Sequence, residues 1–66
     1  MLGWIAVGGD SSVWVKPVDW EEVYVVQLNL QSMVFECWHK SVGGVSRLIG
    51  TGDTPRRAAE LVPKQG

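Results

Sequence analysis

Cys37 and His39 are the one nucleophile and base that lie close together in the sequence. A thiol and an imidazole can form a catalytic pair when they are within hydrogen-bonding distance. They are two positions apart in a segment with strand character, so they project from one face about 7 Å apart, too far for a direct pair. We therefore expect neither residue to be catalytic. Two potential ligands also fall short of the three or four that a zinc site requires.

Asp19, Glu21 and Glu22 form the densest acidic cluster, around Trp20. Two carboxylates in one cleft can divide the roles of general acid and general base. Asp19 followed by Glu22 also resembles a helix capping box, whereas the β-branched residues from Val23 onward disfavour a long helix. We expect one helical turn with solvated charges here, and no active site.

The glycines at Gly50 and Gly52 do not form a phosphate-binding loop, because neither the dinucleotide-binding nor the P-loop spacing of glycines is present. They are typical of a tight turn between a strand and a helix. With no candidate site left, the chain is expected to have no catalytic residue, metal or cofactor and not to be an enzyme. A tiny oligomeric enzyme with its site in a central cleft is the alternative.

The composition favours one small globular domain. The 66 residues are 45% hydrophobic and 20% charged, with a formal net charge of -1; disordered and collagen-like chains are thereby excluded. Cys37 is the only cysteine and cannot form an intrachain disulfide, and no apolar run reaches the ~18 residues of a membrane helix. We expect a soluble cytoplasmic protein with one domain over residues 1–62 and a frayed tail over residues 63–66.

Strands dominate the expected secondary structure. Glycine, proline and polar residues divide the chain into short segments rich in Val, Ile, Trp, Tyr and Phe. In the third segment, Tyr24, Val26 and Leu28 alternate with a second set of side chains, which predicts a half-buried antiparallel strand with its even-numbered residues in the core. The five expected strands are Leu2 to Val7, Ser12 to Lys16, Val23 to Leu30, Met33 to Val42 and Val45 to Gly50.

One helix is expected at the C-terminal end. Thr54 can cap it, Pro55 suits its first position, and the helix should run from Arg56 to Val62 until Pro63 ends it. A helix of two turns is not stable alone, so it must dock on the sheet. The predicted fold class is α+β: a small twisted antiparallel sheet of four or five short strands with one short C-terminal helix.

Gly43 and Gly44 predict a two-residue hairpin loop, with Val42 opposite Val45. Counting outward gives the pairs Lys40–Arg47, Trp38–Ile49 and Glu36–Thr51, with Phe35, Cys37, His39 and Leu48 on the other face. The Phe35 face is expected to be the core. The Trp38–Ile49 pair would then form a second apolar patch lined with charges.

The C-terminal half is basic and resembles known modules. Residues 1–34 sum to a charge of -3 and residues 35–66 to +2. Residues 35–62, with their double glycine, the run Gly50-Thr51-Gly52-Asp53-Thr54 and the alanines that follow, resemble the closing hairpin and helix of double-stranded-RNA-binding domains. Only Arg56 falls on a basic phosphate contact of that family, and Pro55 stands at another. The segment is also similar to small antitoxins of HicB type and to the arm-binding domains of phage integrases, so the resemblance indicates a β-β-α pattern.

Two functions follow as hypotheses. Four tryptophans exceed what so small a core can cover, which favours a non-enzymatic module that binds protein, as a homo-oligomer or with another protein. Its predicted interface residues are Trp38, Ile49, Trp4 and Trp14. The alternative is a nucleic-acid-binding module in which basic side chains contact phosphate and Trp38 stacks on a base. The basic residues of that alternative are Lys40, Arg47, Arg56 and Arg57.

Overall fold

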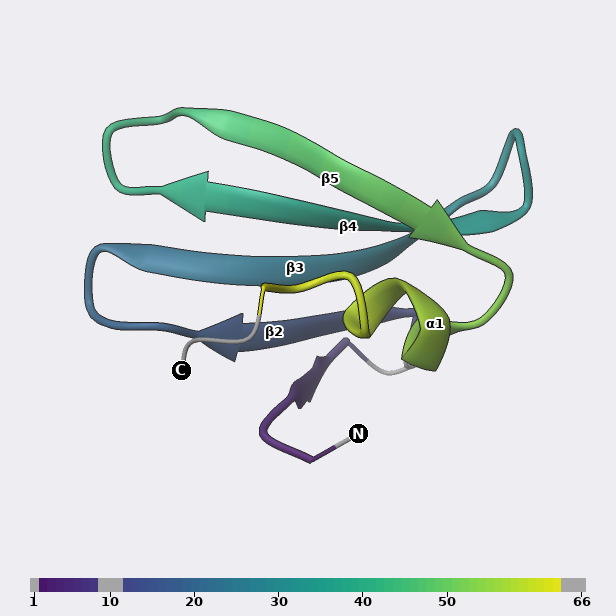
Figure 1. The fold of residues 1–66 in the computed structure, drawn as a ribbon, viewed down its shortest axis with the longest axis horizontal. Coiled ribbons are helices and arrows are strands. Elements are labelled where there is room, and N and C mark those ends of the chain that lie inside the picture. The colour runs from purple at the N-terminus through teal and green to yellow at the C-terminus, as the bar shows by residue number, and fades with distance from the viewer. Residues whose placement is uncertain (1, 9–11, 64–66) are drawn as a thin grey trace.

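The computed structural model describes residues 2–8 and 12–63 and shows one antiparallel sheet with a short helix packed on it (Figure 1). The strands pair in chain order, β1-β2-β3-β4-β5, so each is joined to its neighbour by a hairpin connection. This arrangement confirms the predicted α+β class with a small antiparallel sheet and one C-terminal helix. The elements are β1 (Ile5–Val7), β2 (Val13–Pro17), β3 (Glu22–Asn29), β4 (Val34–Ser41), β5 (Ser46–Gly52) and α1 (Pro55–Ala59).

The two longest strands, β3 and β4, lie at the centre of the sheet, and the three-residue β1 lies at one edge. β1 begins at Ile5, later than expected, and Gly3 before it has a positive φ of 82°. Of the expected tail, only Pro63 is within the described residues, and residues 64–66 lie outside them. In the described part of the chain, no helix is long and apolar enough to cross a membrane.

The connection between β2 and β3 is a bend and contains no helical turn, so the prediction made for Asp19 was wrong in part. The Asp19 carboxylate does accept backbone hydrogen bonds, from the amides of Glu21 at 2.7 Å and Glu22 at 2.9 Å. Those amides belong to a hairpin loop, because Glu22 already begins β3 and its carbonyl accepts from the amide of Val18 at 3.0 Å. An aspartate satisfies exposed amides in either setting, which is why the local pattern did not distinguish them.

The β4–β5 hairpin differs from the expected register near its turn. The loop has three residues: Ser41 donates to the carbonyl of Val45, and Gly44 takes a positive φ of 85°. Lys40 therefore pairs with Ser46, and the predicted Lys40–Arg47 pair was wrong. A β-bulge between Cys37 and Trp38 then restores the expected register. Beyond it, the predicted Glu36–Thr51 pair is confirmed.

The bulge also corrects the positions of two apolar residues. Trp38 pairs with Leu48, so the predicted Trp38–Ile49 pair was wrong, as was the placement of Leu48 on the face of Phe35. Ile49 is the additional residue of the bulge and packs against the core. A bulge inserts one residue, which exchanges the side that the following side chains face.

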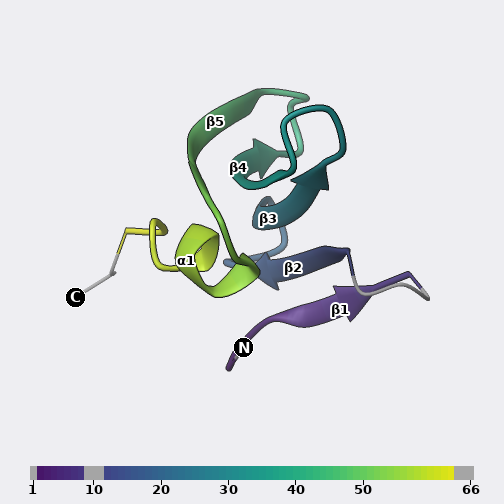
Figure 2. The same cartoon turned by 90° about the vertical axis from the view of Figure 1, so that its right-hand side faces the viewer.

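The core lies between the sheet and α1. Its buried centre consists of Val26, Cys37 and Ala58, each fully inaccessible to solvent. Val26 and Cys37 are paired across β3 and β4, so the even-numbered face of β3 and the Phe35 face of β4 form the core, as predicted. Figure 2 shows α1 on one side of the sheet. The residues packed around the centre are Trp4, Trp14, Phe35, Ile49, Ala59 and Val62.

The helix begins where the sequence predicts and ends earlier. Thr54 is its N-cap, and the hydroxyl of Thr54 accepts a hydrogen bond from the Arg57 amide at 3.1 Å. Pro55 occupies the first turn, and the last helical residue is Ala59, three residues before the expected Val62. A helix this short depends on docking.

Glycines in β5 let α1 approach the sheet. A Cβ added to Gly52 would lie 2.7 Å from the backbone nitrogen of Ala58 and 3.0 Å from the carbonyl carbon of Arg57. At Gly50, an added Cβ would lie 2.9 Å from the terminal methyl Cδ1 of Leu61. The backbones of β5 and α1 are thus nearly in contact at Gly52.

Candidate interaction surface

An apolar row crosses the sheet on the side opposite α1, which we call the open face. The strand register places five residues side by side, one from each strand. They share this face because side chains alternate along a strand and their neighbours in sequence point to the core. This apolar row consists of Ile5, Val15, Val25, Trp38 and Leu48.

The row is most exposed at its two ends. Ile5 is 59% exposed and Leu48 is 45% exposed, whereas Val25 at the centre is only 8% exposed. Trp38 is half-buried beside Val25. Further apolar side chains of the same face, Val7, Val13, Pro17 and Val23, extend the patch around β1 to β3. A contiguous apolar surface of this kind marks an interaction site more often than single exposed hydrophobic residues do.

Two opposite charges flank Trp38 on the open face. Glu36 and Lys40 are each two residues away from Trp38 along β4, so all three side chains project from the same side. Each belongs to a row parallel to the apolar row. The row of Glu36 contains Val7, Val13, Gln27, Glu36 and Thr51, and the row of Lys40 contains Pro17, Val23, Lys40 and Ser46.

Hydrogen bonds hold the Glu36 carboxylate in place. One oxygen accepts from Asn29 Nδ2 at 2.9 Å, and the other accepts from Trp38 Nε1 at 3.1 Å. The hydrogen bond from Asn29, and after it that from Trp38, lowers the pKa of the Glu36 carboxyl below its ordinary value of 4.5. Glu36 therefore keeps its negative charge at neutral pH, and each oxygen can still accept a second donor.

The predicted interface residues fall on both sides of the sheet. Trp38 lies on the open face, as the sequence suggested. Trp4, Trp14 and Ile49 are partly buried against the core on the side of α1, and Trp14 makes an edge contact with Phe35 at 6.0 Å between ring centroids. These three residues stabilise the fold. The interface role of Trp38 stays a prediction.

The four basic residues of the nucleic-acid hypothesis lie in different places. Lys40 is on the open face, whereas Arg47 pairs with His39 on the side of α1. Arg56 and Arg57 belong to the helix, and Arg57 lies 3.6 Å from Asp53. The hypothesis stays a prediction, and the register divides its residues between the two faces of the sheet.

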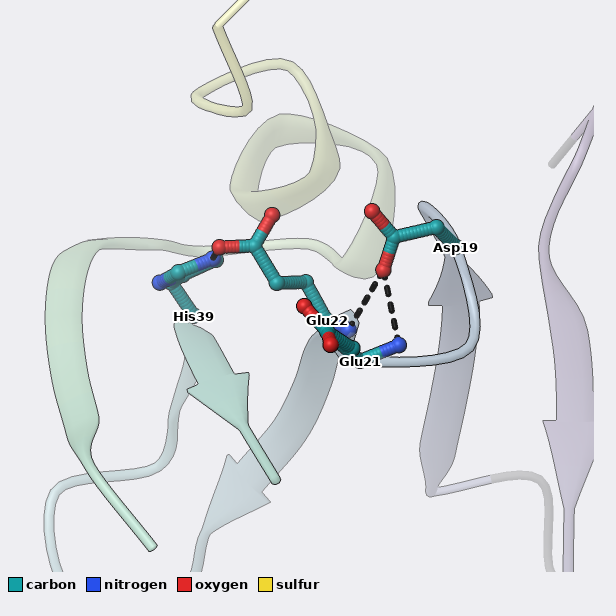
Figure 3. A network of polar contacts seen from close by, with 4 residues as sticks. All are labelled: Asp19, Glu21, Glu22 and His39. Carbon is teal, nitrogen blue, oxygen red and sulfur yellow. Dashed lines mark hydrogen bonds and ion pairs between the residues drawn. The ribbon is translucent and has the colours of Figure 1, made fainter. Parts of the chain in front are cut away.

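The neighbouring titratable side chains of Glu22 and His39 lie on the side of α1. His39 Nε2 is 3.5 Å from the Glu22 carboxylate, and its ring packs at 5.2 Å from the ring of Tyr24. Figure 3 shows Glu22 directed at His39, while Asp19 accepts backbone hydrogen bonds beside them. Among the described residues, no group of three or more His, Cys, Asp or Glu side chains could hold a metal ion.

Cys37 lies on the same face as His39 and is fully buried. Burial raises the pKa of the Cys37 thiol, which disfavours the reactive thiolate. The Cys37 side chain packs against Val26 and Ala58 in the core.

We expect Cys37 to resist alkylation in the folded protein and to react fully in denaturant. Mass spectrometry after treatment with iodoacetamide measures this difference. A Ser32→Cys variant is the control, because Ser32 is exposed in the β3–β4 turn and its thiol should be alkylated without unfolding. Equal labelling of both cysteines in the native state would show that the core does not close over Cys37.

Most of the open face was not found from the sequence. Val25 is among the odd-numbered residues that the alternation places on the solvent side of its strand, no face was predicted for Ile5 or Val15, and Leu48 was assigned to the other face. The available signal was the valines on both sides of the β3 alternation, which indicate a strand with two apolar faces.

Comparison of the chain with protein-family models, with curated proteins and with solved structures finds no match. The similarity of residues 35–62 to nucleic-acid-binding modules thus has no family match behind it. The candidate function has to be inferred from the open face itself.

Proposed function

We propose that this protein is a small non-enzymatic binding module that acts through protein association on its open face and forms a homo-oligomer. The observation that carries the proposal is the apolar row, which extends over all five strands without a polar interruption. An apolar sheet face is normally buried against a second layer of secondary structure, and this row lies on the side of the sheet away from α1.

The energetics favour a partner on this surface. Burial of apolar surface contributes roughly 25 cal/mol per Å², and a domain of about 60 residues buries only about 60% of its unfolded surface. Ile5 and Leu48, the apolar residues at the two ends of the row, each expose about half of their surface or more to solvent. Association would remove them from water and would add stability that the single layer of core lacks.

A charge placed in the apolar row is the direct test. Leu48→Lys should prevent self-association, because a buried lysine without a partner is costly, while an edge-strand position tolerates it in the monomer. Leu61→Lys is the matched control: Leu61 is 41% exposed, close to the 45% of Leu48, but lies beyond α1 on the other side of the sheet. Sedimentation over micromolar to millimolar concentrations measures the mass of each variant.

We expect the wild type and Leu61→Lys to associate and Leu48→Lys to stay monomeric with unchanged circular dichroism. A wild type that is monomeric throughout this concentration range would contradict the proposal. So would a Leu61→Lys variant that dissociates as fully as Leu48→Lys.

A further inference from the structure

The charges of the open face are arranged so that the surface complements itself. The open face carries one acidic and one basic residue among its paired strand positions, Glu36 and Lys40, at equal spacing on either side of Trp38. A rotation that reverses β4 about Trp38 therefore exchanges the positions of the two opposite charges. This self-complementarity is what an isologous two-fold interface requires.

We propose that the second copy packs face to face on the open face, with a two-fold axis that runs along the apolar row. Each Glu36 then lies against the partner's Lys40, and each residue of the apolar row lies against its own copy. This inference rests on the proposed function, and it adds the identity of the occupant and its orientation.

The remaining positions agree with this axis. The rotation places each strand over the same strand of the partner with the direction reversed, so the row of Glu36 faces the partner's row of Lys40. Val13 then faces the partner's Pro17, and Thr51 faces the partner's Ser46, which joins apolar to apolar and hydroxyl to hydroxyl. Gln27 opposite the partner's Val23 is the exception, and Gln27 is only partly buried in the single chain. Two sheets stacked in this way belong to the aligned class, whose strands lie within about 30° of each other.

The other principal two-fold axis runs along the strands and is unfavourable. It would place β4 over the partner's β2, so that Glu36 faces the partner's Val13 and Lys40 faces the partner's Pro17. Both charges would then be buried against apolar side chains without partners. Burial of a charge without a partner is strongly unfavourable, which selects the axis along the apolar row.

The size of the open face fits a dimer of modest affinity. Five strands about 4.8 Å apart give a width of roughly 24 Å, and β2 to β5, with five to eight residues each at about 3.3 Å per residue, give a length of roughly 20 Å. That is on the order of 500 Å² per copy and about 1,000 Å² in total, the lower bound for a specific interface. Measurements therefore need to include micromolar and higher concentrations.

Exchange of the two charges tests the orientation. Glu36→Lys carries lysine at both positions and Lys40→Glu carries glutamate at both, so each homodimer would place like charges together twice. We expect each variant alone to associate at least tenfold more weakly than the wild type. A mixture of the two should form a heterodimer with near wild-type affinity, because both facing pairs are then opposite in charge. Native mass spectrometry with one variant isotope-labelled identifies the heterodimer.

If association is restored when the two variants are mixed, Glu36 of one chain interacts with Lys40 of the other chain, and not with Lys40 of its own chain. Glu36 and Lys40 of one chain are four strand positions apart, about 13 Å, which exceeds the screening length of about 8 Å at physiological salt. If Glu36→Lys fails to fold because it loses the hydrogen bonds from Asn29 and Trp38, Lys40→Glu provides a second series. Lys40→Glu is then mixed with the wild type, and association should fall in the order wild-type homodimer, heterodimer of wild type with Lys40→Glu, Lys40→Glu homodimer.

The outcomes separate the two proposals. A wild type that associates and is dissociated by Leu48→Lys, but whose charge variants gain nothing on mixing, would overturn this orientation and leave the proposed function intact. A wild type that stays monomeric would overturn both.

Discussion

Replacement of Gly52 by alanine is expected to lower the free energy of unfolding by about 2–3 kcal/mol, the upper range for overpacking a core. The new Cβ would lie 2.7 Å from the backbone nitrogen of Ala58 and 3.0 Å from both the carbonyl carbon and the Cβ of Arg57. Two of these three atoms are backbone, so the clash cannot be relieved by a side-chain rotation. The helix would have to move away from β5 and would uncover Ala58, which is fully buried.

The domain is small enough for this loss to be decisive. A core of this size supplies only about 3–5 kcal/mol of net stability. One kcal/mol shifts the melting temperature of a domain of 60–100 residues by about 4–8 °C. Thermal unfolding followed by circular dichroism should therefore show a drop in the melting temperature of at least about 8 °C for Gly52→Ala.

Gly50→Ala is the matched control. It makes the same chemical change two residues earlier on the same face of β5, and its nearest neighbour is the flexible terminal methyl of Leu61 at 2.9 Å. A leucine side chain can rotate away, and removal of a glycine from a strand offsets part of the cost. We expect a change within about 1 kcal/mol. Equal effects of the two substitutions would contradict the close contact between Gly52 and the helix backbone.

The second large effect is expected for association. Trp38→Ala should weaken self-association by about 2 kcal/mol or more, roughly 30-fold in the dissociation constant, as for an interface hot spot. Trp38 lies in the apolar row between Val25 and Leu48 and would lie at the two-fold axis. The measurement is the concentration dependence of mass in sedimentation, with circular dichroism as the check on folding.

The same substitution at Trp14 distinguishes the two faces. Trp14 packs against the core centre and contacts Phe35, so Trp14→Ala should unfold the monomer, with a cost of about 3–5 kcal/mol. Trp38→Phe keeps an aromatic ring but removes the hydrogen bond to Glu36, and should weaken association less than Trp38→Ala. If Trp38→Ala unfolds the chain while Trp14→Ala does not, the assignment of the faces is wrong.

Local sequence signals determined the type of nearly every element. The alternation of Tyr24, Val26 and Leu28 predicted both the strand and its core face, and both are confirmed. Thr54 and Pro55 predicted the start of α1, also confirmed. These signals succeed because strand periodicity and helix capping depend on residues within a few positions of one another.

The Asp19 bend shows where a local signal is ambiguous. An aspartate followed by exposed amides stabilises a helix start or a hairpin loop equally well, and only the pairing of β2 with β3 determines which forms. In the folded protein the two strands pair up to Pro17 and Val23, which leaves Asp19 in the hairpin loop between them.

The open face was determined by tertiary structure alone. Its apolar row requires the register of four successive strand pairs, and a shift of one residue in any pair would move a member to the other side. The bulge opposite Cys37 and Trp38 is such a shift: it directs Ile49 to the core and Leu48 to the open face. Hydrophobicity does not distinguish Leu48 from Ile49, because both are apolar. Their positions follow from where the β5 backbone must insert a residue to stay paired with β4 and still pass close beneath α1 at Gly52.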